Sequence, residues 1–473
     1  MKNATKITLE KILTEEKGSR ADEIRLVLSL SLPAILAQLT SIAMQYIDAG
    51  MVGSLGAGAT ASIGLISTTT WLIGGTCIGV SAGFYVQVAQ LIGARRNKEA
   101  ADVLRQGLKA ALTVGLLVSL ICILISGKLP IWLGGSEDIV KTSSTYFFIY
   151  SLAIPFSLIR QLSGGMMQST GDMKTPSILS GSICILNVIF NFFFIFPTRT
   201  VEVFGLDVKI FGFGLGVAGA AIATTASDMI ISLIMLFMVC FKNKKIALCN
   251  NKGSWKWQGR TIANAAKIVI PLSLDQFFMC SAYVAGTVII APLGTVSVAA
   301  NSLSVTAESL CYMPGYGIGS AATAIIGQTI GADRKDLTKS FSRTVVCLGM
   351  GLMGLTAIFM YFFAPIAFSF LTSDPEVAAL GTKVLRLELI AEPLYGASIC
   401  CAGIFRGAGD TLKPSILNLV SMWGVRILLA ALLVPHMGLM GYWTAMAIEL
   451  CFRGIIFLIR LYRGKWLKKS MVA

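Results

Sequence analysis

The stretch GDMKTP, residues Gly171–Pro176, is matched in the second half of the chain by GDTLKP, residues Gly409–Pro414. Other pairs keep the same offset in sequence over roughly 140 residues without a gap, and a fixed offset of this kind indicates an internal duplication. The other matched pairs are Pro33 and Pro271, Gly56 and Gly294, Gly79 and Gly317, Gln90 and Gln328, Gly93-Ala94 and Gly331-Ala332, and Pro155 and Pro393.

The composition is typical of a membrane protein. Hydrophobic residues make up 55% of the chain and charged residues only 13%, with a mean hydropathy of +0.76. Soluble domains carry roughly 25% charged residues. Many apolar stretches reach about 20 residues, which is enough to cross roughly 30 Å of hydrocarbon. Six Lys and Arg fall within the first 25 residues with no apolar stretch before them, so we expect no cleavable signal peptide.

These stretches predict an all-α integral membrane protein with twelve transmembrane helices. Because six is an even number, two six-helix repeats enter the membrane from the same side and are parallel, as in many secondary transporters. We expect an N-lobe at 26–241, a C-lobe at 263–461, a basic linker at 242–262 and flanking segments at 1–25 and 462–473. The expected helices are 26–50, 57–86, 103–126, 140–163, 175–197, 214–241, 263–290, 296–327, 341–364, 378–404, 413–435 and 438–460.

The positive charge follows this topology. Of 39 Lys and Arg, 32 fall on one face of the predicted bundle, Arg160 among them, and five on the other, while Arg386 and Arg426 fall inside helices. An excess of Lys and Arg on one side marks the cytoplasmic face, so both termini and the linker are expected there. The net charge of +15 is therefore a topology signal, and we expect no nucleic-acid partner.

Metal and enzyme chemistry find little support. The eleven cysteines form no CxxC motif, and His436 is the only histidine. Metal clusters of the Cys/His kind need several such ligands at short spacing. We therefore expect no cofactor and no enzymatic activity.

Charged residues inside the membrane are costly and seldom face lipid, so they mark candidate functional sites. The acids outnumber the internal bases, of which Arg386 and Arg426 are clear and Arg453 is borderline. Such an interior favours a cation, a proton or both. The internal acids are Asp48, Asp228, Asp275, Glu308, Glu388, Glu392 and Glu449.

Spacing separates these acids. Glu388 and Glu392 are four residues apart and share a helix face, where like charges favour protonation of at least one of them and suit a proton carrier. Arg386 lies close enough in sequence to temper this effect. Glu449 and Arg453 are also four apart, and we expect them to neutralise each other.

A polar set is expected inside the N-lobe. Asn187 and Asn191 are one turn apart on one helix, and Thr224 and Asp228 are one turn apart on the next. With Asp48 they provide oxygens that suit a proton or Na⁺. The alternative is an interhelical hydrogen-bond network that holds no ion.

At these residues the chain resembles the MATE (multidrug and toxic compound extrusion) family of cation-coupled exporters. The resemblance extends from about residue 25 to 461, and the paired GD-x-x-x-P segments are its most specific part. The segments that carry it are Tyr46–Gly53, Gly93–Arg96, Gln168–Pro176, Gly219–Thr224, Phe405–Pro414 and Val425–Ile427.

The resemblance implies two six-helix lobes, alternating access, and export driven by inward H⁺ or Na⁺. It places an ion site, with Na⁺ as one candidate, on Asp48, Asn187, Asn191 and Thr224. Related transporters often carry Asp at the position of Asn191, so we expect Asp228 to replace the missing carboxylate.

In the C-lobe, family members often carry an acid deep in the seventh helix, and here the nearest is Asp275, one turn earlier. We count it with Glu308 and Glu392 as further candidates for binding the coupling ion or the substrate.

The leading hypothesis is a monomeric antiporter of the bacterial plasma membrane that exports cationic, amphipathic compounds in exchange for H⁺ or Na⁺. The alternative is a lipid-linked oligosaccharide flippase of the same superfamily, which predicts a basic cavity for pyrophosphate. A membrane-embedded enzyme lacks a histidine or metal constellation, and a channel lacks a selectivity-filter motif.

Overall fold

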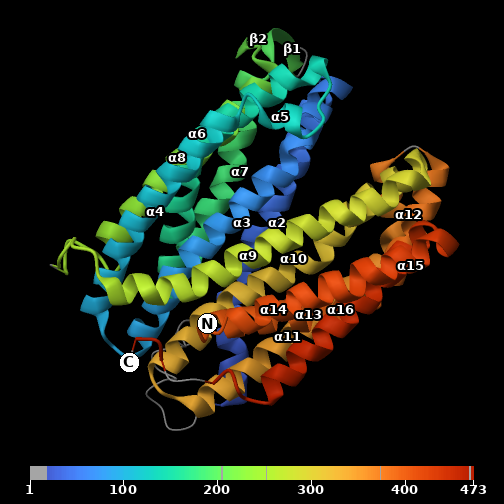
Figure 1. The fold of residues 1–473 in the computed structure, drawn as a ribbon. Helices are drawn as coiled ribbons and strands as arrows, with labels where there is room; N and C mark the ends of the chain where they lie inside the picture. Colours follow the sequence, from blue (N-terminus) through green and yellow to red (C-terminus); the bar gives the residue numbers. More distant parts are fainter. Residues whose placement is uncertain (1–18, 204–205, 252, 373, 468–469, 473) are drawn as a thin grey trace.

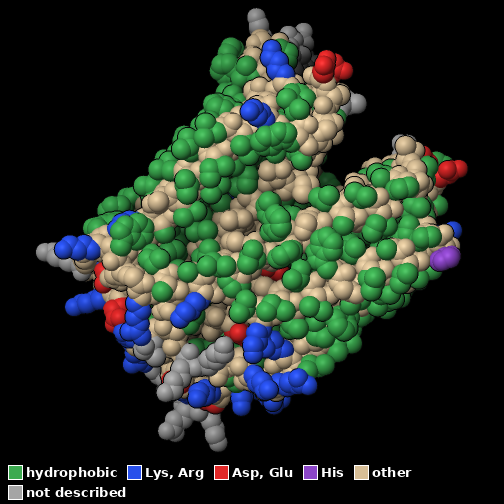
Figure 2. Space-filling view, viewed as in Figure 1, with side chains coloured by type: hydrophobic (Ala, Val, Ile, Leu, Met, Phe, Trp, Pro, Cys, Tyr) green, Lys and Arg blue, Asp and Glu red, His purple; other side chains and the backbone are tan. Residues whose placement is uncertain are grey.

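The computed structural model describes residues 19–203, 206–251, 253–372, 374–467 and 470–472. Two helical lobes meet at one end of the molecule and diverge at the other, which gives a V (Figure 1). Lys and Arg gather where the lobes meet, whereas the flanks of both lobes are largely apolar (Figure 2). We call the closed end the basic end and the opposite end the open end. The predicted segment 1–25 lies mostly outside the described residues.

The N-lobe begins with a helix whose first turn is capped by Ser19, since the Ser19 hydroxyl accepts a hydrogen bond from the backbone N–H of Ala21. Its core packs α3, α4, α6 and α8 together. The helices of this lobe are α2 (Arg20–Gly53), α3 (Ala57–Gly93), α4 (Asn97–Ile125), α5 (Leu129–Trp132), α6 (Glu137–Ser169), α7 (Lys174–Phe194), α8 (Gly216–Phe237) and the π-helical turn η1 (Met238–Lys242).

The C-lobe repeats this order, and its core lies between α10, α11, α12, α13, α15 and α16. Its helices are α9 (Gly259–Ile290), the 3₁₀ turn η2 (Ala291–Leu293), α10 (Thr295–Gly331), α11 (Lys335–Leu371), α12 (Pro375–Glu388), α13 (Glu392–Gly407), α14 (Leu412–Ser421), the π-helical segment η3 (Met422–Ile427), α15 (Leu428–Met437) and α16 (Leu439–Tyr462).

The predicted twelve spans are confirmed. Within the described residues, nine helices are long and apolar enough to cross a membrane, and α12 with α13 forms a tenth, bent span. Two further helices, α10 with 37 residues and α16 with 24, complete the set. Both helices carry charged residues that are buried between helices, namely Glu308 on α10 and the pair Glu449 and Arg453 on α16.

The all-α fold class is confirmed, and the structure adds one small element that the sequence did not predict. A two-stranded antiparallel hairpin, β1 (Pro197–Val203) and β2 (Leu206–Phe213), stands at the open end of the N-lobe (Figure 1). The predicted helix over 175–197 therefore ends at Phe194. Pro197 cannot continue a helical hydrogen-bond ladder, and the Val- and Thr-rich sequence that follows favours extended backbone.

A second correction concerns the helix predicted over 378–404. It is interrupted at residues 389–391, and α12 and α13 meet at an angle of 61°. Pro393 lacks a backbone N–H and disfavours helical geometry in the residue before it. Its counterpart Pro155 lies inside the unbroken α6, so the proline permits the break without forcing it.

The two lobes meet along α2 and α10 on one side and along α3 and α9 on the other. At the basic end the contact is reciprocal. The side-chain amide of Gln90 donates to the carbonyl of Gly407 (3.1 Å), and that of Gln328 donates to the carbonyl of Ser169 (2.7 Å). The two donors occupy equivalent positions of the repeats, and so do the two acceptors. We call this contact between the lobes, around Gln90 and Gln328, the seam. It follows the pseudo-twofold symmetry of the duplication.

Glycine makes this crossing possible. A Cβ atom on Gly93 would overlap the carbonyl group of Gln328, and one on Gly331 would overlap that of Gln90. After each glycine the chain turns through a left-handed residue, Arg95 with φ 61° and the equivalent Asp333 with φ 53°. The lobes therefore touch main chain to main chain at the basic end.

Candidate functional site

The structure brings four predicted residues of the N-lobe together. The Asn191 amide on α7 donates to Asp48 Oδ1 on α2 (2.5 Å) and to Asn187 Oδ1 (2.9 Å). The Asn187 amide in turn donates to the Thr224 hydroxyl on α8 (3.0 Å). We call these four residues the N-lobe set, and they join three helices into one polar cluster.

The N-lobe set arises because Asn187 and Asn191 stand one turn apart and so lie on the same face of α7. Both asparagines are fully buried, and Asn191 Oδ1 has no hydrogen-bond partner in the described chain. Asp48 lies five residues before the end of α2 at Gly53, which places the set toward the open end. A carboxylate beside amide and hydroxyl oxygens can take up a proton or bind a hard cation.

Asp228 does not join the N-lobe set. Its carboxylate forms an ion pair with Arg160 Nε on α6 (2.5 Å) and accepts a hydrogen bond from the Ser157 hydroxyl. The prediction that Arg160 lies on the basic face was wrong, because α6 extends to Ser169 instead of ending near residue 163. Arg160 is therefore about 13 Å inside the end of its helix, where it needs an acidic partner.

The C-lobe gathers three acids. Glu308 on α10, Glu388 at the end of α12 and Glu392 at the start of α13 each place a carboxylate oxygen within 4.8 Å of the other two. We call them the carboxylate trio. Glu388 and Glu392 are 0% exposed, and neither of them finds a hydrogen-bond donor for either oxygen among the described residues. The trio thus combines acidic groups at short distance, burial and missing donors, and such an arrangement is costly when the groups are ionised.

Sequence reasoning placed Glu388 and Glu392 on one face of a continuous helix, whereas they flank the bend between α12 and α13. The expected tempering by Arg386 is also not seen. The Arg386 guanidinium donates to the carbonyl of Tyr361 (3.0 Å) and lies over the ring of that residue, 5.0 Å from its centroid. Arg386 therefore turns toward α11 and away from the trio.

The predicted pairing of Glu449 with Arg453 is confirmed, with Nε and Oε1 at 2.7 Å. A third member, Arg426, also binds Glu449 at 2.7 Å, and the Ser421 hydroxyl donates to it. Arg426 belongs to the π-helical segment η3, and π-helical bulges often mark functional positions. Among the described residues both guanidiniums form their ion pairs with Glu449, while their charges still attract Glu308 in the carboxylate trio.

Asp275 on α9 stands apart from the trio. It accepts a hydrogen bond from the Asn418 amide (3.1 Å) and lines a cavity of about 200 Å³ inside the C-lobe. Arg453 and Arg406 line the same cavity, and Arg406 Nε has no hydrogen-bond partner among the described residues. Acidic and basic groups thus face each other across this space.

The repeat reveals a relation that inspection of single motifs missed. The N-lobe positions equivalent to the trio are occupied by Thr70, Tyr150 and Ile154. Two of these residues also meet, since the Tyr150 hydroxyl donates to the carbonyl of Thr70 (3.3 Å). The repeat offset, applied to Glu388, would have shown that its N-lobe counterpart is an uncharged tyrosine.

Comparison with known proteins follows the same division into halves. The sequence profile of the MatE family matches residues 33–193 and 271–432, so the two matched segments begin at the equivalent residues Pro33 and Pro271. The chain belongs to the MatE family. It is thus a multi-pass membrane transporter, in agreement with the resemblance seen at the paired GD-x-x-x-P segments.

Curated relatives match along nearly the whole MatE chain. The probable multidrug resistance protein NorM of Thermotoga maritima is 24% identical over 94% of both chains. The protein of the same name from Neisseria meningitidis serogroup B is 26% identical over 92% of both chains. A solved structure titled as the outward-facing conformation of a multidrug resistance MATE family transporter has a TM-score of 0.85 at 20% identity, covering 99% of this chain and 100% of its own. This last match concerns the fold alone.

Proposed function

We propose that this MatE-family protein is a secondary active antiporter that exports cationic, amphipathic organic compounds in exchange for H⁺ or Na⁺ by alternating access. The observation that carries the proposal is the carboxylate trio, Glu308, Glu388 and Glu392, which is buried and poor in donors. Two of its members find no donor at all among the described residues, so an exchangeable cation or proton is the natural charge balance.

The repulsion between the three carboxylates can be estimated from Coulomb's law. Two unit charges about 4 Å apart interact by about 4 kcal/mol at an effective dielectric constant near 20. Three ionised carboxylates within 4.8 Å would repel one another by several times that amount. Protons, Na⁺ or a cationic substrate each relieve the repulsion, and competition between them for the same oxygens gives exchange.

The gathering of Lys and Arg at the basic end supports a cytoplasmic location for that end and for both termini (Figure 2). With this orientation the V opens away from the cytoplasm, and we propose that it is an outward-facing state in a bacterial inner membrane. The N-lobe set lies toward the open end, where an external coupling ion would load. We propose a monomer without cofactor or nucleic-acid partner, which handles small organic molecules within the bilayer.

The names of the relatives support export of drug-like compounds, because those proteins are called multidrug resistance proteins. One observation favours the alternative of a lipid-linked oligosaccharide flippase. The cavity beside Asp275 carries Arg406 and Arg453, and guanidinium groups suit anionic headgroups. The acidic trio, which is the larger uncompensated charge, favours cations and therefore the antiporter.

Transport in proteoliposomes tests the proposal. A pH gradient and a Na⁺ gradient are imposed separately, and uptake of an ethidium-like cation is compared with that of an anionic amphiphile of similar size. We expect cation transport driven by at least one gradient. Preference for the anion would favour the flippase, and transport that neither gradient changes would contradict antiport.

A further inference from the structure

At the basic end, the two glutamine side chains that join the lobes form equivalent hydrogen bonds as donors, but they differ in the hydrogen bonds that they accept. Gln90 and Gln328 are equivalent, and both donate across the seam. Gln90 Oε1 additionally accepts two hydrogen bonds from the C-terminal segment, from the hydroxyl of Ser470 (3.0 Å) and from the backbone N–H of Met471 (2.9 Å). The C-terminal segment therefore binds the glutamine that spans the seam.

The same segment contacts both lobes. On the N-lobe side the Arg96 guanidinium donates to the carbonyl of Val472 (2.6 Å). On the C-lobe side the Asn264 amide of α9 donates to the carbonyl of Met471 (3.0 Å). The Met471 side chain packs on an apolar cluster that itself includes residues of both α3 and α9, namely Ala82, Val86 and Ile268.

The segment is anchored on the C-lobe just before it crosses. Trp466 is buried, its ring lies 5.9 Å from that of Phe405, and its indole N–H donates to the carbonyl of Leu461 (2.9 Å). Met471 then lies against Gly409, whose φ of 75° and missing side chain leave it room. The equivalent glycine of the N-lobe, Gly171, has open space at this position.

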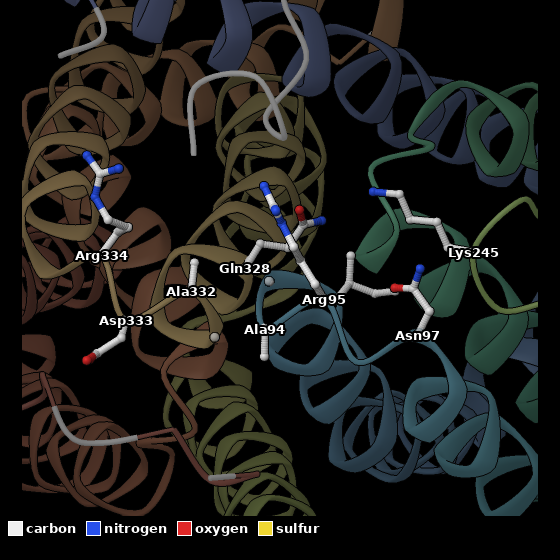
Figure 3. Close-up of a pocket in the computed structure, with 11 residues that line it drawn as sticks. Ala94, Arg95, Asn97, Lys245, Gln328, Ala332, Asp333 and Arg334 are labelled. Carbon is white, nitrogen blue, oxygen red and sulfur yellow. The ribbon is translucent and has the colours of Figure 1, made fainter. Parts of the chain in front are cut away.

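The surroundings of the equivalent glutamine, Gln328, are different. A cavity of about 550 Å³ lies beside Gln328, and Figure 3 shows it between the turns that follow α3 and α10. Ala94 and Arg95 line it from one turn and Ala332 and Asp333 from the other, with Lys245 beyond them. Among the described residues, the C-terminal segment thus binds Gln90, whereas a cavity adjoins the equivalent Gln328.

We propose that the seam at Gln90 is a docking surface for the chain's own C-terminal segment, Ser470–Val472, and that the docked segment acts as a latch that holds the lobes together at the basic end. The inference rests on the alternating-access part of the proposed function. The inward-facing state requires the lobes to part where Gly93 and Gly331 now touch the facing main chain. The segment cannot then keep its partners on both lobes, so undocking precedes or accompanies that step.

Hydrogen exchange of the purified full-length protein tests the latch against a variant that ends at residue 469. We expect exchange to rise about tenfold in the basic-end segments 82–94 and 320–332, since several modest hydrogen bonds are lost together. Exchange in the open-end segments 57–66 and 295–304 should fall, because the lobes close there as they part at the seam. Unchanged exchange, or an equal rise at both ends, would overturn the latch.

A matched pair of substitutions keeps the test independent of truncation. Arg96 binds Val472 through Nη1 and binds Glu99 through Nε and Nη2. Arg96→Ala removes both contacts, whereas Glu99→Ala removes only the ion pair. We expect the opposite shifts at the two ends from Arg96→Ala alone, at about threefold. An equal response of both variants would refute the latch. Shifted exchange without gradient-driven transport would keep the latch and refute the antiporter.

Discussion

The two lobes share one backbone plan but differ in chemistry at equivalent positions. Where the C-lobe has the carboxylate trio, the N-lobe has Thr70, Tyr150 and Ile154, of which Tyr150 donates to the carbonyl of Thr70. The Tyr150 hydroxyl thus has a partner within the N-lobe, whereas the carboxylates of Glu388 and Glu392 have no hydrogen-bond donor among the described residues. Duplication thus supplied two similar scaffolds, and at these positions only the C-lobe carries buried carboxylates.

Nearer the open end, the acid lies in the N-lobe and its equivalent position in the C-lobe is uncharged. The N-lobe set is built around Asp48, whereas the equivalent residue of the C-lobe is Gly286. The C-lobe nevertheless has its own bond between the first and fifth helices of the repeat, from Asn418 to Asp275. Asp275 lies eleven residues earlier in its helix than Asp48 does in α2, about 16 Å closer to the basic end. The lobes therefore place an aspartate–asparagine pair at different depths.

The largest effect is expected from neutralising the trio. Glu388→Gln or Glu392→Gln should lower gradient-driven transport about 100-fold while preserving or raising thermal stability, because a buried acid without donors is removed. Proteoliposome transport and a thermal unfolding curve of each variant measure the two quantities. Tyr150→Phe, at the N-lobe position equivalent to Glu388, is the control and should retain most transport. Full transport by both Gln variants would end the difference drawn between the lobes.

The second prediction concerns Asp48. Asp48→Asn keeps a partner for Asn191 but removes the only carboxylate of the N-lobe set, so gradient-driven efflux should fall about tenfold at normal expression. Efflux from cells, normalised to the amount of protein in the membrane, measures it. Asp138→Asn changes an exposed acid near the open end of α6 and should be silent. If Asp48→Asn were as active as this control, only the C-lobe would couple.

The third prediction separates structural from functional acids within the N-lobe. Asp228→Asn leaves Arg160 without its partner and should destabilise the protein by about 2 kcal/mol, somewhat below the cost for a fully buried pair because Arg160 is 25% exposed. The double variant Arg160→Gln with Asp228→Asn should recover part of the loss in thermal unfolding. Adding Asn191→Asp to Asp228→Asn should not restore the lost stability. Rescue by Asn191→Asp would instead return Asp228 to the coupling site.

The smallest effect is expected at the paired turns of the seam. Arg95→Gly and Asp333→Gly each relieve a left-handed residue and should stabilise by about 0.5 kcal/mol, after the greater freedom of glycine in the unfolded chain is deducted. Transport should not change. Thermal unfolding of both variants checks whether the two lobes respond alike at these equivalent turns. A loss of stability in only one of the variants would show that the two sides of the seam are not energetically equivalent.

Local spacing predicted much of the structure. The repeat placed the paired turns, and one-turn spacing brought Asn187 and Asn191 to a common face beside Asp48. The pairing of Glu449 with Arg453 followed from the same rule. These relations lie within one helix or within one repeat register, where helical periodicity alone decides which side chains meet.

Contacts between distant helices were beyond such rules. Glu308 meets Glu388 only because α10 packs against the bend after α12, and a proline at the equivalent Pro155 produces no break. Arg426 reaches Glu449 through a π-helical segment that no residue pattern announced. Arg160 was misplaced because the length of α6 was underestimated. In each case packing between helices, which periodicity does not encode, set the outcome.

The main-chain contacts at Gly93 and Gly331 have a consequence for electrical leakage. A membrane potential of about 100 mV exerts about 2.3 kcal/mol on each elementary charge that crosses, so any water-filled gap between the lobes would conduct ions continuously. A barrier made of side chains opens whenever rotamers change. Here the two backbones approach so closely that even a methyl group is excluded, so this part of the barrier does not depend on side-chain rotamers.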